Sequence, residues 1–155
     1  MLQEIVNGPI QEGGIEELKE LIAGKIGTAA KLKLFKSSFS PSQTSVNADF
    51  VASECDFVGY LGKALTMGTP GLDSDGHAVS YSGDSIFTAT DATTPNSVGG
   101  CWIEVETATT PSPVYAPYRY FQFPNPIPMA SALATLSVTV AMQSPGQFTS
   151  VIVDS

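Results

Sequence analysis

The sequence predicts a mainly β protein, an antiparallel β-sandwich or barrel with a short N-terminal amphipathic helix. Two observations lead to this class. Residues 64–155 carry seven acids and one basic residue, Arg119, and alternate apolar and polar side chains in short runs. Turn-forming residues separate these runs, which favours about six to eight short strands. We expect an arm and helix in residues 1–30 and one β domain in residues 31–155.

The N-terminal arm carries a helical pattern. Its apolar side chains recur at a spacing that places them on one face of a helix, at Ile15, Leu18, Leu21 and Ile22. A helix this short is marginal alone, so we expect it to dock on another element. Two roles fit this pattern: it covers one face of the sheet, or it reaches a neighbouring subunit.

Residues 31–36 alternate lysine with apolar side chains, which predicts a half-buried strand. Three of the six lysines of the chain lie here, at Lys31, Lys33 and Lys36. On an edge strand they would oppose unwanted strand pairing. On an acidic partner they would form contacts. We therefore expect a mildly basic N-terminal region that faces a partner and an acidic β body that faces outward.

The middle of the chain mixes loops with short elements. A loop is expected at residues 37–45, followed by a helical turn at Ala48–Phe50 and a strand at Cys55–Leu61. Within that strand Gly59 would permit a bulge or a close backbone approach.

The remaining chain predicts a ladder of strands. Two short strands, at residues 78–81 and 85–89, are expected to form a hairpin-like pair through Gly83. Proline-rich residues 124–128 predict an extended linker. The other strand candidates are residues 101–106, 118–123, 134–142 and 148–153.

The cysteines and the histidine offer little catalytic chemistry. Cys55 and Cys101 could pair, but the N-terminus lacks the pattern of a secretory signal, which favours two buried free thiols. Cys55 lies between two acids, which would raise the pKa of its thiol and disfavour a nucleophilic role. One histidine, His77, is too few for a typical zinc site.

Asp73 and Asp75 begin a segment that resembles the start of a calcium-binding loop. The further oxygen ligands and the glutamate of such a loop do not follow. A plain β-turn is favoured, with a calcium-binding turn as the alternative. We predict no cofactor, no metal and no catalytic residue.

Two surface features fit either a binding or a structural role. Glu104 and Glu106 could be the paired carboxylates of a glycosidase, but their alternation with apolar residues favours a solvated sheet face. Trp102 and the tyrosines could stack on a sugar. Aromatic side chains on sheets more often form a core or an interface, and we assign partner contacts to Tyr118, Tyr120 and Phe121.

Composition narrows the partners. The net charge of −8 argues against binding to nucleic acid or to anionic membranes. Charged residues make up 14 % of the chain, against roughly 25 % in average soluble proteins. We expect part of the surface to meet other protein.

The region from Leu32 to Leu65 resembles small virion proteins of tailed bacteriophages, above all capsid decoration (cement) proteins. The resemblance rests on the order of four motifs: Leu34-Phe35, Phe39-Ser40-Pro41, Ala48-Asp49-Phe50 and Phe57-Val58-Gly59-Tyr60.

The resemblance implies a non-enzymatic β-rich protein that binds the lattice of major capsid protein and stabilises the shell, often as a homotrimer. It implies synthesis in the host cytoplasm and a final place on the capsid surface of the virion. The amphipathic N-terminal helix departs from the smallest cement proteins. A tail- or fibre-associated structural or receptor-binding protein is therefore the alternative.

Overall fold

The computed structural model describes residues 30–108, 114–143 and 147–155. The predicted N-terminal helix and almost all of the predicted arm lie outside these ranges. The elements in chain order are β1 (Lys31–Lys36), α2 (Asn47–Ala52), β2 (Lys63–Ala64), β3 (Gly71–Leu72), β4 (Ala78–Tyr81), β5 (Ser85–Thr88), β6 (Asn96–Ala108), β7 (Val114–Met129), β8 (Thr135–Gln143) and β9 (Gln147–Asp154).

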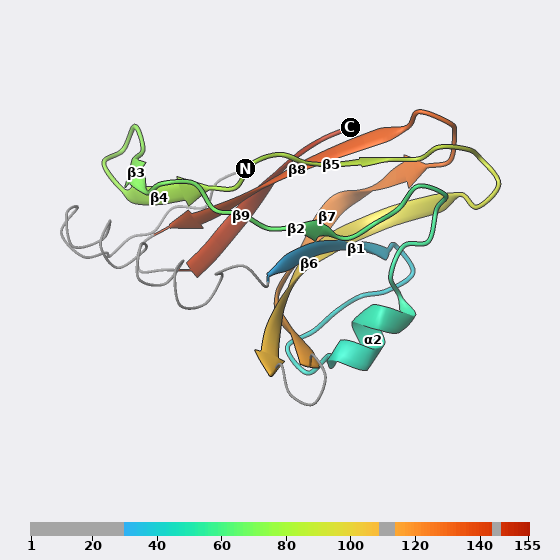
Figure 1. The fold of residues 1–155 in the computed structure, drawn as a ribbon, viewed down its shortest axis with the longest axis horizontal. Coiled ribbons are helices and arrows are strands. Elements are labelled where there is room, and N and C mark those ends of the chain that lie inside the picture. Colours follow the sequence, from blue (N-terminus) through green and yellow to red (C-terminus); the bar gives the residue numbers. More distant parts are fainter. Residues whose placement is uncertain (1–29, 109–113, 144–146) are drawn as a thin grey trace.

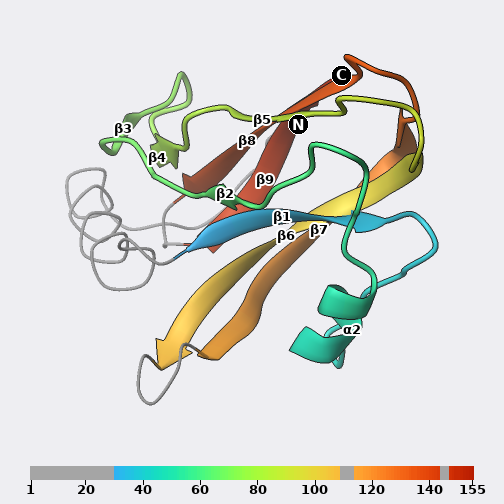
Figure 2. The same ribbon diagram turned by 45° about the vertical axis from the view of Figure 1, so that its right-hand side comes forward.

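The strands form two antiparallel sheets that lie one above the other (Figures 1 and 2). The four-stranded sheet has the order β2-β1-β6-β7. In the five-stranded sheet the order is β3-β4-β8-β5, and β9 also pairs with β8. The sheets do not close into a barrel. The prediction of a mainly β protein is confirmed, and the helix in the described ranges is the very short α2.

Aliphatic side chains from both sheets fill the space between them. Leu32 and Leu34 of β1 are fully buried, as the alternation of that strand predicts. The same alternation buries one face of β8. The main core also takes residues from the loops and from the long strands; its members include Phe57, Phe87, Ile103, Met129, Leu136, Val138 and Val140.

A second, aromatic core lies on the opposite face of the four-stranded sheet, under α2 (Figure 2). Phe50 of α2 packs against Trp102 of β6, with ring centroids 5.3 Å apart. Phe35 of β1 completes the buried set, and all three side chains are at most 2 % exposed. The predicted helical turn is confirmed. In its first turn the Asp49 carboxylate accepts a hydrogen bond from the Val46 N–H at 2.9 Å.

The chain after α2 covers the outer edge of β1. The Cys55 N–H donates to the Leu34 carbonyl at 2.9 Å, and the Lys36 N–H donates to the Ser53 carbonyl at 2.8 Å. The Leu34 N–H donates to the phenol oxygen of Tyr60 at 3.0 Å. Further along, β2 pairs with the start of β1. Backbone groups that an edge strand would expose are therefore satisfied.

The prediction of a strand at Cys55–Leu61 is wrong. The segment makes single contacts along β1 and then turns at Gly59, whose φ is 95°. A side chain at Gly59 would place its Cβ 2.7 Å from the Thr88 carbonyl oxygen. The predicted close backbone approach is confirmed, and the turn that it permits ends the extended run.

The predicted hairpin between residues 78–81 and 85–89 is also wrong. Strands β4 and β5 both pair with β8 and lie end to end along one of its edges. Ser82 bridges the break: its N–H donates to the Val140 carbonyl, and its hydroxyl accepts the Val140 N–H, both at 2.8 Å. A serine side chain thus replaces one ladder partner where the strand is interrupted.

The proline-rich residues 124–128 do not form a linker, which corrects a third prediction. They lie inside β7, the edge strand of the four-stranded sheet. The pairing of β6 with β7 shifts between Val98 and Gly100, which are opposite Ile127 and Gln122. Proline is tolerated at this irregular edge because no neighbouring strand needs its missing N–H.

Candidate functional site

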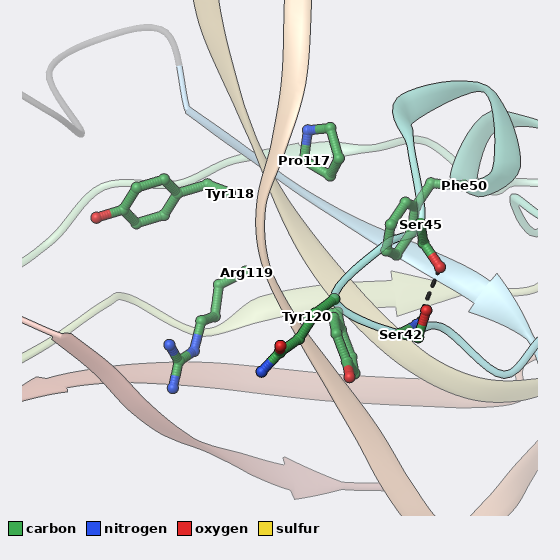
Figure 3. Close-up of a pocket in the computed structure, with 8 residues that line it drawn as sticks. Ser42, Ser45, Phe50, Pro117, Tyr118, Arg119 and Tyr120 are labelled. Carbon is green, nitrogen blue, oxygen red and sulfur yellow. Dashed lines mark hydrogen bonds between the residues drawn. The ribbon is translucent and has the colours of Figure 1, made fainter.

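A pocket of about 480 Å³ lies where β7 approaches α2 and the loop before it (Figure 3). Aromatic, hydroxyl and cationic groups share its lining. The lining residues are Ser42, Gln43, Ser45, Phe50, Pro117, Tyr118, Arg119 and Tyr120.

The structure brings two of the three predicted aromatic contacts to this pocket. Tyr118 is 42 % exposed, and Tyr120 packs on Phe50 with ring centroids 6.4 Å apart. Phe121 is half-buried and packs against the main core instead. Both tyrosines lie on the edge strand of the sheet, and each stays at least partly exposed.

Arg119 is the site residue that the sequence argument missed. Its side chain is exposed, and within the described ranges the guanidinium makes no ion pair and no hydrogen bond. A usable signal was present, because Arg119 lies inside the aromatic segment and is the one basic residue after Lys63. In Figure 3 its side chain and that of Tyr118 extend to one side of β7, away from Phe50.

The three predicted lysine contacts lie on β1, away from the pocket lining. Lys33 Nζ lies 3.3 Å from a Glu104 carboxylate oxygen and 3.7 Å from one of Glu54. Lys36 Nζ lies 3.0 Å from the Asp56 carboxylate.

Lys31 is exposed, and its Nζ lies 5.4 Å from the ring centroid of Tyr115. Lys63 Nζ lies 5.8 Å from the ring centroid of Phe87. Lys33 and Lys36 are thus matched by acids of the same chain, so they contribute little net positive charge to the surface. Lys31 is the lysine of β1 best placed to meet a partner.

The Asp73 carboxylate organises the turn between β3 and β4. Asp73 Oδ1 accepts hydrogen bonds from the N–H groups of Asp75 and His77, both at 2.9 Å. Asp73 Oδ2 accepts from Gln143 Nε2 at 3.1 Å and lies 3.6 Å from His77 Nδ1. Burial acts to raise the pKa of Asp73, but the hydrogen bonds that its carboxylate accepts outweigh it and lower the pKa.

Ligand-type atoms of Asp73, Asp75 and His77 lie within 4.8 Å of one another. Because both oxygens of Asp73 already accept hydrogen bonds, the β-turn explains the position of this side chain. The calcium-binding alternative gains no separate support from the geometry.

The two thiols lie on either side of Leu34. The Cys55 N–H bonds to the Leu34 carbonyl, and Cys101 is opposite Leu34 on β6. Two strand spacings of about 4.8 Å separate their backbones by roughly 10 Å, too far for a disulfide. Both are free. Burial raises the pKa of Cys55 to about 12 and also raises that of Cys101, so neither thiol is an activated nucleophile.

Trp102 is 0 % exposed and belongs to the aromatic core, so it agrees with the favoured interpretation and cannot stack on a sugar. The α2 helix and Phe50 cover it. Glu104 is 3 % exposed and pairs with Lys33, which corrects the prediction of a solvated face at this position. The side chain of Glu106 lies outside the described part.

No family model, curated protein or solved structure matches the chain. Among the helices in the described ranges, none has the length and apolar character needed to cross a bilayer. The surface geometry and the resemblance in residues 32–65 are therefore the two observations that point to a function.

Proposed function

We propose that this protein is a non-enzymatic structural protein of a tailed-bacteriophage virion, a decoration or cement protein. It binds the lattice of major capsid protein and stabilises the shell. The observation that carries the proposal is the site on β7, where Tyr118, Arg119 and Tyr120 line the pocket at one edge of the two-sheet body. Aromatic side chains and arginine are the residues enriched at protein–protein interfaces.

The same proposal gives each remaining part a role. The body is a β-sandwich, and the arm and amphipathic helix that the sequence predicts in residues 1–30, almost all of which lie outside the described ranges, would reach a neighbouring subunit. The protein assembles as a homotrimer on the capsid surface after synthesis in the host cytoplasm. Many weak contacts then act together, because multivalent attachment multiplies modest affinities. The net charge of −8 keeps free subunits apart before assembly.

Attachment to particles tests the proposal. Purified protein is added to capsids that lack it, and its occupancy and position are measured by electron cryo-microscopy. We expect density on the shell, with occupancy reduced at least tenfold by the double substitution of Tyr118 and Arg119 with alanine. Ile86→Ala is the matched control, because Ile86 is 54 % exposed on the other sheet.

Two results would contradict the proposal. Full occupancy by the double variant would show that the β7 site is not the contact. Density on tails or fibres alone would favour the alternative, a tail- or fibre-associated structural or receptor-binding protein. That alternative draws on the same pocket, whose hydroxyl groups and arginine would suit a small polar ligand.

A further inference from the structure

Prolines divide the exposed edge of β7 into a blocked part and an open part. Strand β7 is the last strand of its sheet, and among the described strands it pairs only with β6. Proline lacks the N–H that an added strand would need, so it protects an edge from unwanted pairing. Four prolines lie in β7, at positions 117, 124, 126 and 128. Between the first two prolines, Arg119–Phe123 contains none, and among the described residues it forms an open window.

The open window has the size of a strand-binding site. It spans five residues, which is about the usual length of a strand in globular proteins. Strand addition to an exposed sheet edge is a common mode of peptide recognition, in which backbone hydrogen bonds supply affinity and side chains supply specificity. The other edge of the same sheet has no comparable window, because residues 53–63 cover β1.

The side chains of the window indicate the chemistry of the incoming segment. Arg119 is exposed and is not engaged by any acid within the described part of the chain. Lys33 and Lys36 each have a carboxylate within 4 Å. A partner carboxylate would complete the same pattern at Arg119, where two parallel hydrogen bonds are available to it.

Charge and burial limit the partner further. The chain carries a net charge of −8, so a strongly acidic partner would be repelled at other positions. One acidic side chain placed at Arg119 avoids this cost. Phe121 is half-buried at the margin of the main core, and an apolar side chain of an added strand would cover it.

We propose that the outer edge of β7 binds an extended segment of a partner protein by strand addition over residues 119–123. The segment places one acidic side chain against Arg119 and an apolar side chain over Phe121. This inference depends on the proposed function, because it names the kind of segment that the virion partner would supply.

Synthetic peptides test the inference without particles. The probe is a blocked nonapeptide that alternates threonine and valine with one central glutamate, and its matched controls carry glutamine or lysine at the centre. Backbone amide exchange is measured by NMR. We expect the glutamate peptide to slow exchange at Arg119–Phe123 and to bind about tenfold more tightly than the lysine peptide, because a hydrogen bond to a charged group is lost.

Two variants separate the backbone from the side-chain contribution. Arg119→Ala should keep the exchange protection and abolish the preference for glutamate. Gln122→Pro should abolish the protection, because it places a proline in the window at an exposed position. A glutamate peptide that is N-methylated at alternate residues lacks the N–H groups needed to pair with β7. It tests backbone pairing on the wild-type protein, so the result does not depend on whether Gln122→Pro folds.

Four outcomes would overturn the inference. The first is that no peptide slows exchange at Arg119–Phe123. The second is that the N-methylated peptide binds as tightly as the parent peptide. The third is that amide exchange in the window slows when the protein concentration alone is raised, which would mean that a second copy of this chain occupies the edge. The fourth is that glucuronic acid binds in a way that requires Arg119 but does not slow amide exchange, which would indicate a sugar site.

The particle assay distinguishes this failure from failure of the proposed function. If the protein binds capsids and Arg119→Ala and Gln122→Pro both leave occupancy unchanged, strand addition is wrong while the decoration role stands. If the peptide results hold and the protein does not attach to capsids, the strand-binding edge stands with a different partner.

Discussion

The two edges of the four-stranded sheet differ in how their outward backbone groups are satisfied. On the β1 side, residues 53–63 follow the strand and satisfy its outward backbone groups, and Tyr60 supplies a phenol oxygen where no backbone partner is present. On the β7 side no strand of the described chain follows, and prolines lie on both sides of the segment that contains Arg119–Phe123. One edge is therefore satisfied by the fold itself, whereas among the described residues the other has no partner strand over Arg119–Phe123.

The largest expected effect comes from the aromatic core that lies between the two edges. Phe50→Ala removes a side chain that is 2 % exposed and packs on Trp102 and Tyr120. We expect the free energy of unfolding in urea to fall by about 3–5 kcal/mol. Val51→Ala is the control, since Val51 is 51 % exposed on the same helix, and its effect should stay within about 0.5 kcal/mol. A loss below about 1 kcal/mol for Phe50→Ala would mean that α2 is not part of a core.

Asn96 ties the covering segment to β6 and should have the next largest effect. Its Oδ1 accepts hydrogen bonds from the N–H groups of Asp56 and Phe57, at 2.7 and 3.0 Å. Asn96→Ala leaves the buried Phe57 N–H without this partner, so we expect a loss of about 2–3 kcal/mol in thermal or urea unfolding. Asn125→Ala, at an exposed position of β7, should change stability little. Equal effects of the two substitutions would contradict a special role for the covered edge.

Tyr60→Phe tests the single side chain that covers the edge of β1. The phenol accepts the Leu34 N–H at 3.0 Å and donates to Glu54 at 2.9 Å. Loss of both should cost about 1–2 kcal/mol and speed amide exchange at Leu34. Tyr81→Phe, at a position 37 % exposed on β4, is the control. Unchanged exchange at Leu34 would show that the phenol does not protect this edge.

Acid should weaken the β1 side through its carboxylates. The hydrogen bond from Asn96 and then Lys36 lower the pKa of Asp56; hydrogen bonds also lower that of Asp73 on the other sheet. A lowered folded-state pKa means that this stability is present above the ordinary value of 3.8 and is lost as pH falls below it. We expect the free energy of unfolding to fall below pH 3.8, and Asp56→Asn with Asp73→Asn to reduce that slope. An identical slope in the double variant would exclude these groups as its source.

The smallest effect on stability is expected at the open edge. Arg119→Ala should change the free energy of unfolding by no more than about 0.5 kcal/mol, because the Arg119 side chain makes no ion pair or hydrogen bond among the described residues. The measurement is urea unfolding beside the wild type. A loss of more than about 1 kcal/mol would assign Arg119 to the fold and remove the contrast between the two edges.

Local patterns were enough to predict the fold class and several of its parts. The alternation in β1 and β8 gave the correct buried faces, and the short α2 lay where a helical turn was expected. The apolar run at Cys55–Leu61 was predicted to be a strand because its pattern is typical of one. Its actual conformation depends on its long-range contacts with β1, which the local pattern does not contain. The burial of Trp102 depends on where α2 docks, which no local pattern contains.

The candidate site was predictable in part for the same reason. Tyr118 and Tyr120 stood out as aromatic residues in a charge-poor segment, and the pocket contains both. The lysines of β1 looked free because their acids, Glu104 and Asp56, are far away in sequence or on a covering loop. Charge pairing across a sheet follows from topology, which the sequence does not display directly.

The two buried thiols on either side of Leu34 can report how fast two regions of the molecule open. Cys55 belongs to the segment that covers β1, whereas Cys101 lies in β6, between β1 and β7. Under native conditions a thiol reagent reaches each cysteine only when its own region opens. Cys55 should therefore react at the rate at which the covering segment detaches, and Cys101 only when the sheet itself comes apart. The ratio of the two labelling rates would measure how far the closed edge moves independently of the body.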